Sequence, residues 1–107
     1  MRGGDQSARH RAVVRAVRDA APSVGWVLWP IGQTSGPTRR PVVPQGFPDL
    51  IGCNLSGTLV GVEVKTGKGK LTKAQMWWRE EFIVHREVIH LVVSSVDDFL
   101  AQARRGR

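Results

Sequence analysis

The sequence contains only one cysteine, Cys53, so it offers no internal disulfide. Neither this thiol nor the three histidines have zinc-site spacing, and no serine or cysteine has a histidine partner for a nucleophilic triad. No apolar run is long enough to cross a bilayer, and the charged N-terminal segment 1–11 lacks the apolar stretch of a secretory signal. We therefore expect a soluble, cytoplasmic protein.

Acidic side chains are few relative to basic ones. Nine Asp and Glu stand against sixteen Lys and Arg, which gives a formal net charge of +7 and a pI near 11.1. Such a charge attracts polyanions, most commonly nucleic acid, although a basic surface can also serve solubility alone. A membrane surface fits less well, because no strongly apolar amphipathic helix accompanies the charge. With 107 residues and 41% apolar content, residues 1–107 are expected to form one domain.

Hydrophobic periodicity and turn residues predict alternating helices and strands. In chain order, the expected elements are a helix ending at Pro22, strands at 25–32, 49–55 and 58–65, a helix at 71–85, a strand at 87–93 and a helix at 94–105. This α-β-β-β-α-β order, with a final helix, predicts an α/β fold with a mixed β-sheet flanked by helices. The strand 87–93 should lie parallel to 58–65, because the helix between them forms a crossover.

Three local features accompany these elements. Asp5 or Ser7 is expected to cap the first helix. Ser56-Gly57 suits a hairpin turn between two strands. Cys53 lies in the apolar run LIGCNL, so we expect it to be a small buried residue.

The strand 58–65 carries two charged side chains on one face. Because side chains alternate along a strand, Glu63 and Lys65 project together while Val62 and Val64 enter the core. Asp49 begins the neighbouring strand, and pairing can bring its carboxylate beside Glu63. Two carboxylates suit Mg²⁺ or Mn²⁺, and Lys65 could orient an attacking water. The alternative is a half-exposed strand with solvated charges, beside an aspartate that serves a turn.

Gln75 has two candidate roles. Thr72 and Gln75 have T-x-x-Q spacing, so the amide can return to the Thr72 backbone N–H in a capping box. Its place beside the apolar stripe of the helix also allows it to point toward Glu63 and Lys65. Spacing alone favours the cap.

The loop 66–70, TGKGK, does not have the spacing of a nucleotide-binding P-loop. Five residues separate Gly61 from Gly67, and a glycine follows Lys68 where serine or threonine is required. We therefore expect no nucleotide cofactor. Basic residues of this loop, the adjoining helix and the Pro-rich loop 33–46 are expected to contact DNA phosphates or, alternatively, to be merely solvated: Lys68, Lys70, Lys73, Arg39 and Arg40.

The histidines and tryptophans are assigned structural roles. His10 lies on the apolar side of the first helix and His90 within an apolar strand, where core positions are more common than catalytic ones. Trp78 is expected in the core. Trp77 lies off the main stripe, and packing, for example against a second subunit, is favoured over stacking on a base.

The segments GFPDLIG (46–52) and VGVEVKTGKGKLTKAQ (60–75) resemble the PD-(D/E)XK nuclease superfamily, and more narrowly the VRR-NUC family, whose stand-alone members are similar to phage and bacterial Holliday-junction resolvases. The resemblance implies a restriction-endonuclease-like fold and a Mg²⁺- or Mn²⁺-dependent, structure-selective DNA endonuclease. It implies that Asp49, Glu63 and the Val64 backbone carbonyl bind the metal. It further implies that Lys65 handles the attacking water and that Gln75 supports the site.

One position departs from the family pattern. The family usually has an acidic residue early in its first helix, and that place falls near Gln6, with Asp5 adjacent. Either residue could complete the metal site, and the sequence does not choose between them. A homodimer is expected, because cutting both strands of a junction requires two sites. The alternative function is a nucleic-acid-binding module on the same fold that has no catalytic activity.

Overall fold

The computed structural model describes the backbone of residues 2–31, 43–67 and 69–105, and side chains from residue 8 onward within these ranges. In chain order the elements are α1 (Arg2–Ala20), the 3₁₀ helix η1 (Ala21–Val24), β1 (Val27–Pro30), β2 (Leu50–Cys53), β3 (Leu59–Val64), α2 (Lys73–Glu80), the π-helical turn η2 (Glu81–His85), β4 (Ile89–Val93) and α3 (Val96–Arg105). The predicted α/β fold and its element order are confirmed.

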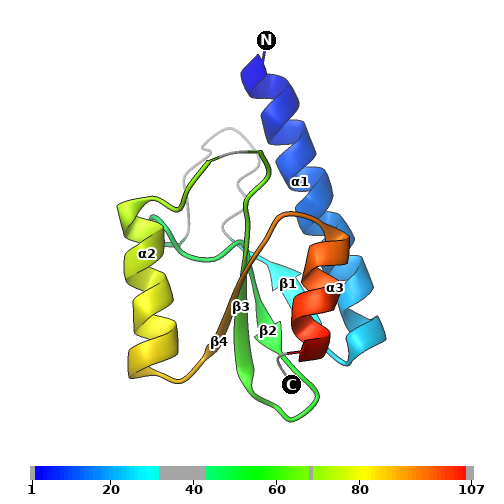
Figure 1. Ribbon diagram of the computed structural model, residues 1–107, viewed down its shortest axis with the longest axis vertical. Helices are drawn as coiled ribbons and strands as arrows, with labels where there is room; N and C mark the ends of the chain where they lie inside the picture. Colours follow the sequence, from blue (N-terminus) through cyan, green and yellow to red (C-terminus); the bar gives the residue numbers. More distant parts are fainter. Residues whose placement is uncertain (1, 32–42, 68, 106–107) are drawn as a thin grey trace.

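The strands form a mixed sheet in the order β1-β2-β3-β4 (Figure 1). β1 pairs antiparallel with β2, and β2 pairs antiparallel with β3. β3 pairs parallel with β4, and α2 connects them as the predicted crossover. α2 runs back along the sheet from the end of β3 toward the start of β4. The first turn of α2 therefore lies near the residues that follow β3.

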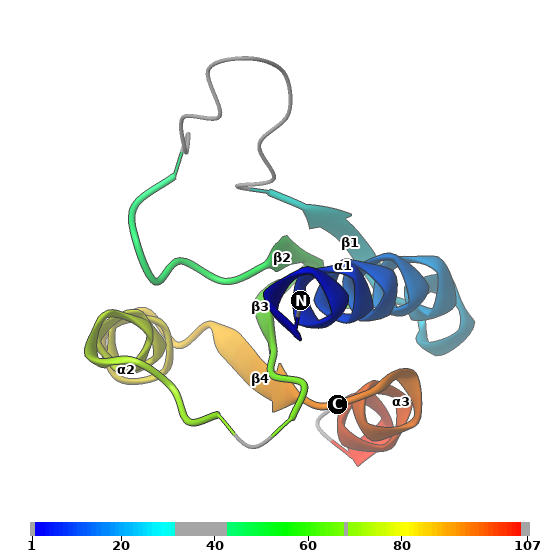
Figure 2. The ribbon, with the colours of Figure 1, turned by 90° about the horizontal axis from the view of Figure 1, so that it is seen from above.

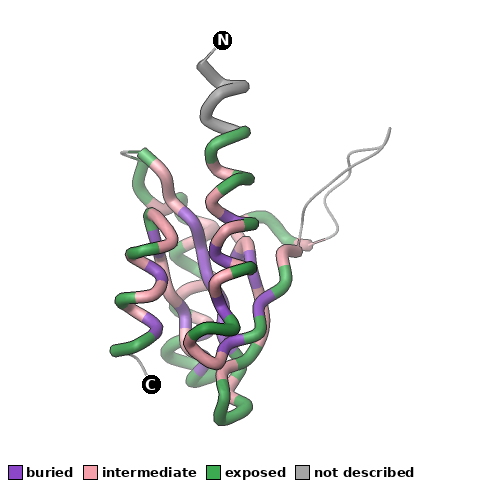
Figure 3. The backbone as a smooth tube through the Cα atoms, turned by 90° about the vertical axis from the view of Figure 1, so that its right-hand side faces the viewer, coloured by how far each residue is buried: buried purple, intermediate pink, exposed green. Residues whose placement is uncertain are grey.

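Helices cover both faces of the sheet. α1 and α3 lie on one face and α2 on the other, as the view from above shows (Figure 2). The main core forms between the sheet and the first pair of helices, and its members are Val14, Val17, Ala21, Trp26, Leu28, Leu50, Val60, Val62, Val64, Val93, Phe99 and Ala103. Buried positions are concentrated in the strands and on the inward sides of these helices (Figure 3). The alternation of Val60, Val62 and Val64 therefore orients β3, as predicted.

A smaller aromatic cluster packs under α2. Phe47 makes edge-to-face contacts with Trp78 and Phe82, with ring centroids 4.8 and 5.7 Å apart. A Cβ atom on Gly61 of β3 would meet the Phe82 ring at 2.9 Å, so glycine allows η2, which continues α2, to approach the sheet closely. Trp78, which was expected in the core, is instead half-buried in this cluster. Trp77 is 55% exposed and contacts the Trp78 ring.

The β2–β3 hairpin has the predicted turn, but Cys53 at the end of β2 is not buried as expected. Asn54 Oδ1 accepts hydrogen bonds from the backbone N–H groups of Ser56 and Thr58, and Gly57 has a φ of 83°. Cys53 is exposed rather than buried. Its partner across the sheet, Val27, is 66% exposed, because α2 leaves this part of the sheet face open.

The helix ends also differ in part from prediction. α1 begins at Arg2, so Asp5 and Ser7 lie inside the helix and neither caps it. Residues that favour an N-cap position can also be accommodated within a helix. In α3, the Asp98 N–H donates to Ser95 Oγ over 3.1 Å, as expected for a cap. None of the described helices has the length and apolar character needed to cross a membrane.

Candidate active site

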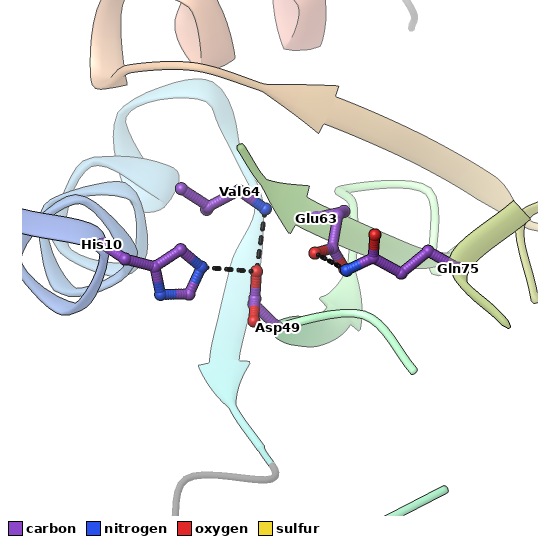
Figure 4. A network of polar contacts seen from close by, with 5 residues as sticks. All are labelled: His10, Asp49, Glu63, Val64 and Gln75. Atoms are coloured by element: carbon purple, nitrogen blue, oxygen red, sulfur yellow. Dashed lines mark hydrogen bonds and ion pairs between the residues drawn. The ribbon is translucent and has the colours of Figure 1, made fainter. Parts of the chain in front are cut away.

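Asp49 and Glu63 come together at the C-terminal end of β3. Leu50 pairs with Val62, so one further step in the same antiparallel register sets Asp49 opposite Glu63. Asp49 Oδ2 accepts a hydrogen bond from the Val64 backbone N–H over 2.9 Å (Figure 4). The backbone of β3 therefore holds the Asp49 carboxylate directly beside the strand that carries Glu63.

Glu63 is buried, with 3% of its surface exposed. This excludes the alternative in which β3 is half-exposed and the Glu63 carboxylate is solvated. Burial raises the pKa of Glu63 to about 8, and the negative charge of Asp49 adds to this rise. The positive charge of Lys65 opposes it. A carboxylate buried beside Asp49 is therefore stabilised by a proton or by a cation.

Gln75 connects this pair of carboxylates to α2 and fulfils both roles considered from the sequence. Its Oε1 accepts from the Thr72 backbone N–H over 2.8 Å, and its own N–H donates to Thr72 Oγ1 over 3.1 Å. Its Nε2 donates to Glu63 Oε2 over 2.8 Å (Figure 4). The capping box fixes the side chain, and the fixed side chain orients the carboxylate.

His10 of α1 is the contact that sequence reasoning missed. Its Nε2 lies 3.2 Å from Asp49 Oδ2, on the side of Asp49 away from Glu63 (Figure 4). The hydrogen bond to Asp49 is the main reason why the pKa of His10 is raised, against the opposing effect of burial. The available signal was its i, i+4, i+7 spacing with Val14 and Val17, which places His10 on the side of α1 that packs on the sheet.

The basic residues occupy positions around this end of β3. Lys65 follows the strand directly, is half-exposed, and its backbone N–H donates to Val93 O over 2.8 Å. Lys70 precedes α2 and Lys73 begins it, and both are exposed. The remaining predicted positions lie outside the described residues or side chains: Lys68, Arg39, Arg40, Asp5 and Gln6.

The donors present fit a hard divalent cation. Asp49 and Glu63 supply carboxylate oxygens, and Val64 carries a main-chain carbonyl at the end of the same strand. Mg²⁺ and similar ions often take only one or two protein carboxylates and retain waters. Within the part of the chain that the structure describes, no three His, Cys, Asp or Glu side chains already surround a common point.

A mixed sheet between α2 and the α1–α3 pair, with acids at the end of β3, defines a small α/β domain. A solved structure described as a VRR_NUC domain matches with a TM-score of 0.66 and 21% identity, covering 92% of this chain and 97% of that chain. The chain therefore has a VRR_NUC-like nuclease fold, and the resemblance indicated by its sequence is supported at the level of the fold. No protein-family model and no curated protein matches the sequence.

Proposed function

We propose that this protein is a metal-dependent, structure-selective DNA endonuclease that hydrolyses phosphodiester bonds and acts on four-way junctions. The observation that carries the proposal is the buried Glu63 beside Asp49, on a strand that continues directly into Lys65. A buried carboxylate at this position has an energetic cost unless a cation or proton neutralises it. A VRR_NUC-like fold agrees with such a site.

In the proposed mechanism, Asp49, Glu63 and the Val64 carbonyl would hold Mg²⁺ or Mn²⁺. When bound, the ion would stabilise negative charge on the phosphoryl oxygens and activate a water. Lys65 would orient the attacking water and stabilise the negative charge that develops during the attack. Gln75 keeps the Glu63 carboxylate in one orientation through its 2.8 Å hydrogen bond.

The proposed substrate contacts lie around the same end of the sheet. Lys70 and Lys73 are exposed there, and the +7 net charge of the chain favours a polyanionic partner. Lys68, Arg39 and Arg40 are proposed to extend this phosphate-binding surface. Cleavage of both strands of a junction requires two active sites, so the proposal includes a homodimer. We further propose that the protein meets its DNA substrate in the cytoplasm of a bacterium or of a phage-infected cell.

Cleavage assays test the proposal directly. The protein is incubated with four-way junctions, flaps, and single- and double-stranded DNA, with Mg²⁺, with Mn²⁺ or with EDTA. We expect metal-dependent cleavage of branched DNA, reduced at least about a hundredfold in Lys65→Ala and in Asp49→Asn. Asp97→Asn removes an exposed acid of α3 and should leave cleavage unchanged. Absence of cleavage on every substrate, or full activity in Lys65→Ala, would overturn the proposal.

A second candidate is a nucleic-acid-binding module without catalytic activity. The observation that favours it is that a histidine, His10, contacts Asp49 from the helix where the family usually has an acid. This function predicts DNA binding that weakens with salt but is indifferent to EDTA and to Asp49→Asn. Calorimetric Mn²⁺ or Mg²⁺ binding that Asp49→Asn abolishes would count against it.

A further inference from the structure

Three arginines form a basic stripe along one flank of α1. Arg11, Arg15 and Arg18 follow i, i+4, i+7 spacing, so they share a side of the helix that differs from the side packed on the sheet. Arg11 and Arg15 are exposed, and residues 6–18 contain no acid. Like charges at i, i+4 destabilise a helix, so the stability of α1 does not explain this stripe.

Most of this positive charge is not neutralised by the protein. Arg18 Nε donates to Asp19 Oδ1 over 3.0 Å, whereas within the described side chains no acid pairs with Arg11 or Arg15. The planar guanidinium group matches the oxygens of a phosphate. Seven residues of helix rise about 10.5 Å, a length over which one DNA strand carries about three phosphates. The stripe therefore has the charge and the length to follow a short stretch of one strand.

An exposed tryptophan lies at the Arg18 end of the stripe. Trp29 of β1 is 66% exposed, and the guanidinium carbon of Arg18 lies 5.8 Å from its ring centroid. β1 forms an edge of the sheet, which brings this ring within reach of α1. Proteins that hold single-stranded nucleic acid combine such exposed rings, on which bases stack, with cationic groups that contact the backbone.

The stripe begins beside the candidate active site. Arg11 follows His10, which contacts Asp49, and Ile31, two residues after Trp29, donates its backbone N–H to Asp49 O over 3.0 Å. Both elements of the stripe are thus joined to the segment that carries one of the two acids.

Basic groups therefore flank the active site on two sides. α1 and α2 lie on opposite faces of the sheet (Figure 2), and the exposed Lys70 and Lys73 belong to the α2 side. A DNA strand that crosses the end of β3 would meet these lysines on one side of the site and the arginine stripe on the other.

We propose that Arg11, Arg15, Arg18 and Trp29 form a second nucleic-acid contact, which holds a single-stranded segment of DNA next to the active site. The arginines bind successive phosphates, and an unpaired base stacks on Trp29. This inference rests on the proposed function for the identity of the polyanion, but it involves no metal and none of the residues assigned to catalysis.

Binding measured in EDTA tests the arginines without cleavage. Anisotropy of a fluorescently labelled single-stranded oligonucleotide is followed at several salt concentrations. The double variant Arg11→Ala/Arg15→Ala should lower the slope of log affinity against log salt by about 1.4, because each phosphate contact to a single strand contributes about 0.7. Arg9→Ala is the matched control. It removes an exposed arginine of the same helix, about 200° around the axis from Arg11, and should leave the slope close to the wild-type value.

Two substitutions and one cross-link test the stacking. Trp29→Leu should weaken single-strand binding about tenfold, whereas Trp29→Phe keeps an aromatic face and should lose much less. Urea unfolding checks that both variants are folded. In the wild-type protein, ultraviolet irradiation of a bound oligonucleotide that contains 5-bromodeoxyuridine should join the base to Trp29, as identified by peptide mass spectrometry.

The inference and the proposed function fail in distinguishable ways. Equal losses of slope in the double variant and in Arg9→Ala would overturn the inference alone. Wild-type affinity in Trp29→Leu, or a cross-link confined to Trp77 of α2, would do the same. If the wild-type protein binds no DNA at all, both the second contact and the proposed function are overturned.

Discussion

Gln75 Nε2 donates a hydrogen bond to Glu63 Oε2 over 2.8 Å, while Oε1 of the same amide accepts from the Thr72 backbone N–H. An amide has a donor end and an acceptor end, so one side chain can cap α2 and orient a buried carboxylate at once. The stability of the first turn of α2 and the geometry of the site are thereby coupled through a single residue.

Gln75→Glu separates these two roles. A glutamate can still accept from the Thr72 N–H, but it replaces the amide donor to Glu63 with a third carboxyl group near Asp49. We expect cleavage to fall about tenfold or more. Thr72→Val provides the matched control, because it removes the hydroxyl acceptor of the cap alone. It should lower the free energy of unfolding by about 1 kcal/mol and leave cleavage nearly unchanged.

Cleavage rates and urea unfolding of both variants check this prediction. If Gln75→Glu cleaves DNA at the wild-type rate with wild-type stability, Gln75 has a purely capping role.

Gly46→Ala should strongly destabilise the fold at the contact between the Asp49 segment and α2. Gly46 has a φ of +85°, and a Cβ atom there would lie 2.5 Å from the backbone carbon of Ala74. Both the conformation and the contact oppose a side chain, so we expect a loss of about 3 kcal/mol or more.

Gly57→Ala is the matched control for this substitution. Gly57 has nearly the same φ, +83°, but its Cβ would meet nothing within 4 Å. It should cost only about 1–2 kcal/mol in urea unfolding. Equal losses in the two variants would show that the approach of α2 does not restrict position 46.

The contribution of Glu63 to the stability of the metal-free protein should fall as the pH rises from 5 to 8, whereas the lowered pKa of His90 acts in the opposite direction below about pH 6.5. The pKa of Glu63 is about 8 in the folded state, against 4.5 ordinarily, so between these values the folded state retains a proton that the unfolded state has lost. The contribution of Glu63 to the free energy of unfolding is therefore fully present below pH 4.5 and is lost as the pH rises to about 8. We expect Glu63→Gln to remove on the order of 1–2 kcal/mol of this dependence.

Thermal unfolding at several pH values measures the effect, and Glu80→Gln, at an exposed site on α2, should retain the wild-type profile. Added Mn²⁺ or Mg²⁺ competes with the proton and should raise the Tm more at pH 8 than at pH 6. Identical pH profiles for Glu63→Gln and the wild type would contradict the buried, protonated Glu63.

Lys70→Ala and Lys73→Ala should weaken DNA binding in a salt-dependent manner. Each substitution removes one proposed phosphate contact, so the slope of log affinity against log salt should decrease by about 1. Arg105→Ala is the control, because Arg105 is exposed at the end of α3, opposite to the loop that precedes α2 (Figure 1). If all three variants lower the slope equally, the attraction comes from the overall charge rather than from this loop.

Local patterns in the sequence determined much of the fold. The alternation of Val62 and Val64 with Glu63 and Lys65 defined the face of β3 that enters the main core, and the Ser56-Gly57 turn joined it to β2. Once two strands are joined by a tight turn, their register follows from the chain itself. The approach of Asp49 to Glu63 follows in the same way, because the two residues belong to neighbouring strands.

Contacts between distant segments were decided only by the tertiary structure. His10 reaches Asp49 across 39 positions, Cys53 is exposed because α2 covers only part of its face of the sheet, and the buried Glu63 accepts a hydrogen bond from Gln75 of α2. Periodicity reports which side of an element is apolar, but not which partner covers it. The sequence by itself therefore determined the elements, the register and the pair of acids. The packing of α1 and α2 onto the sheet decided the surroundings of that pair.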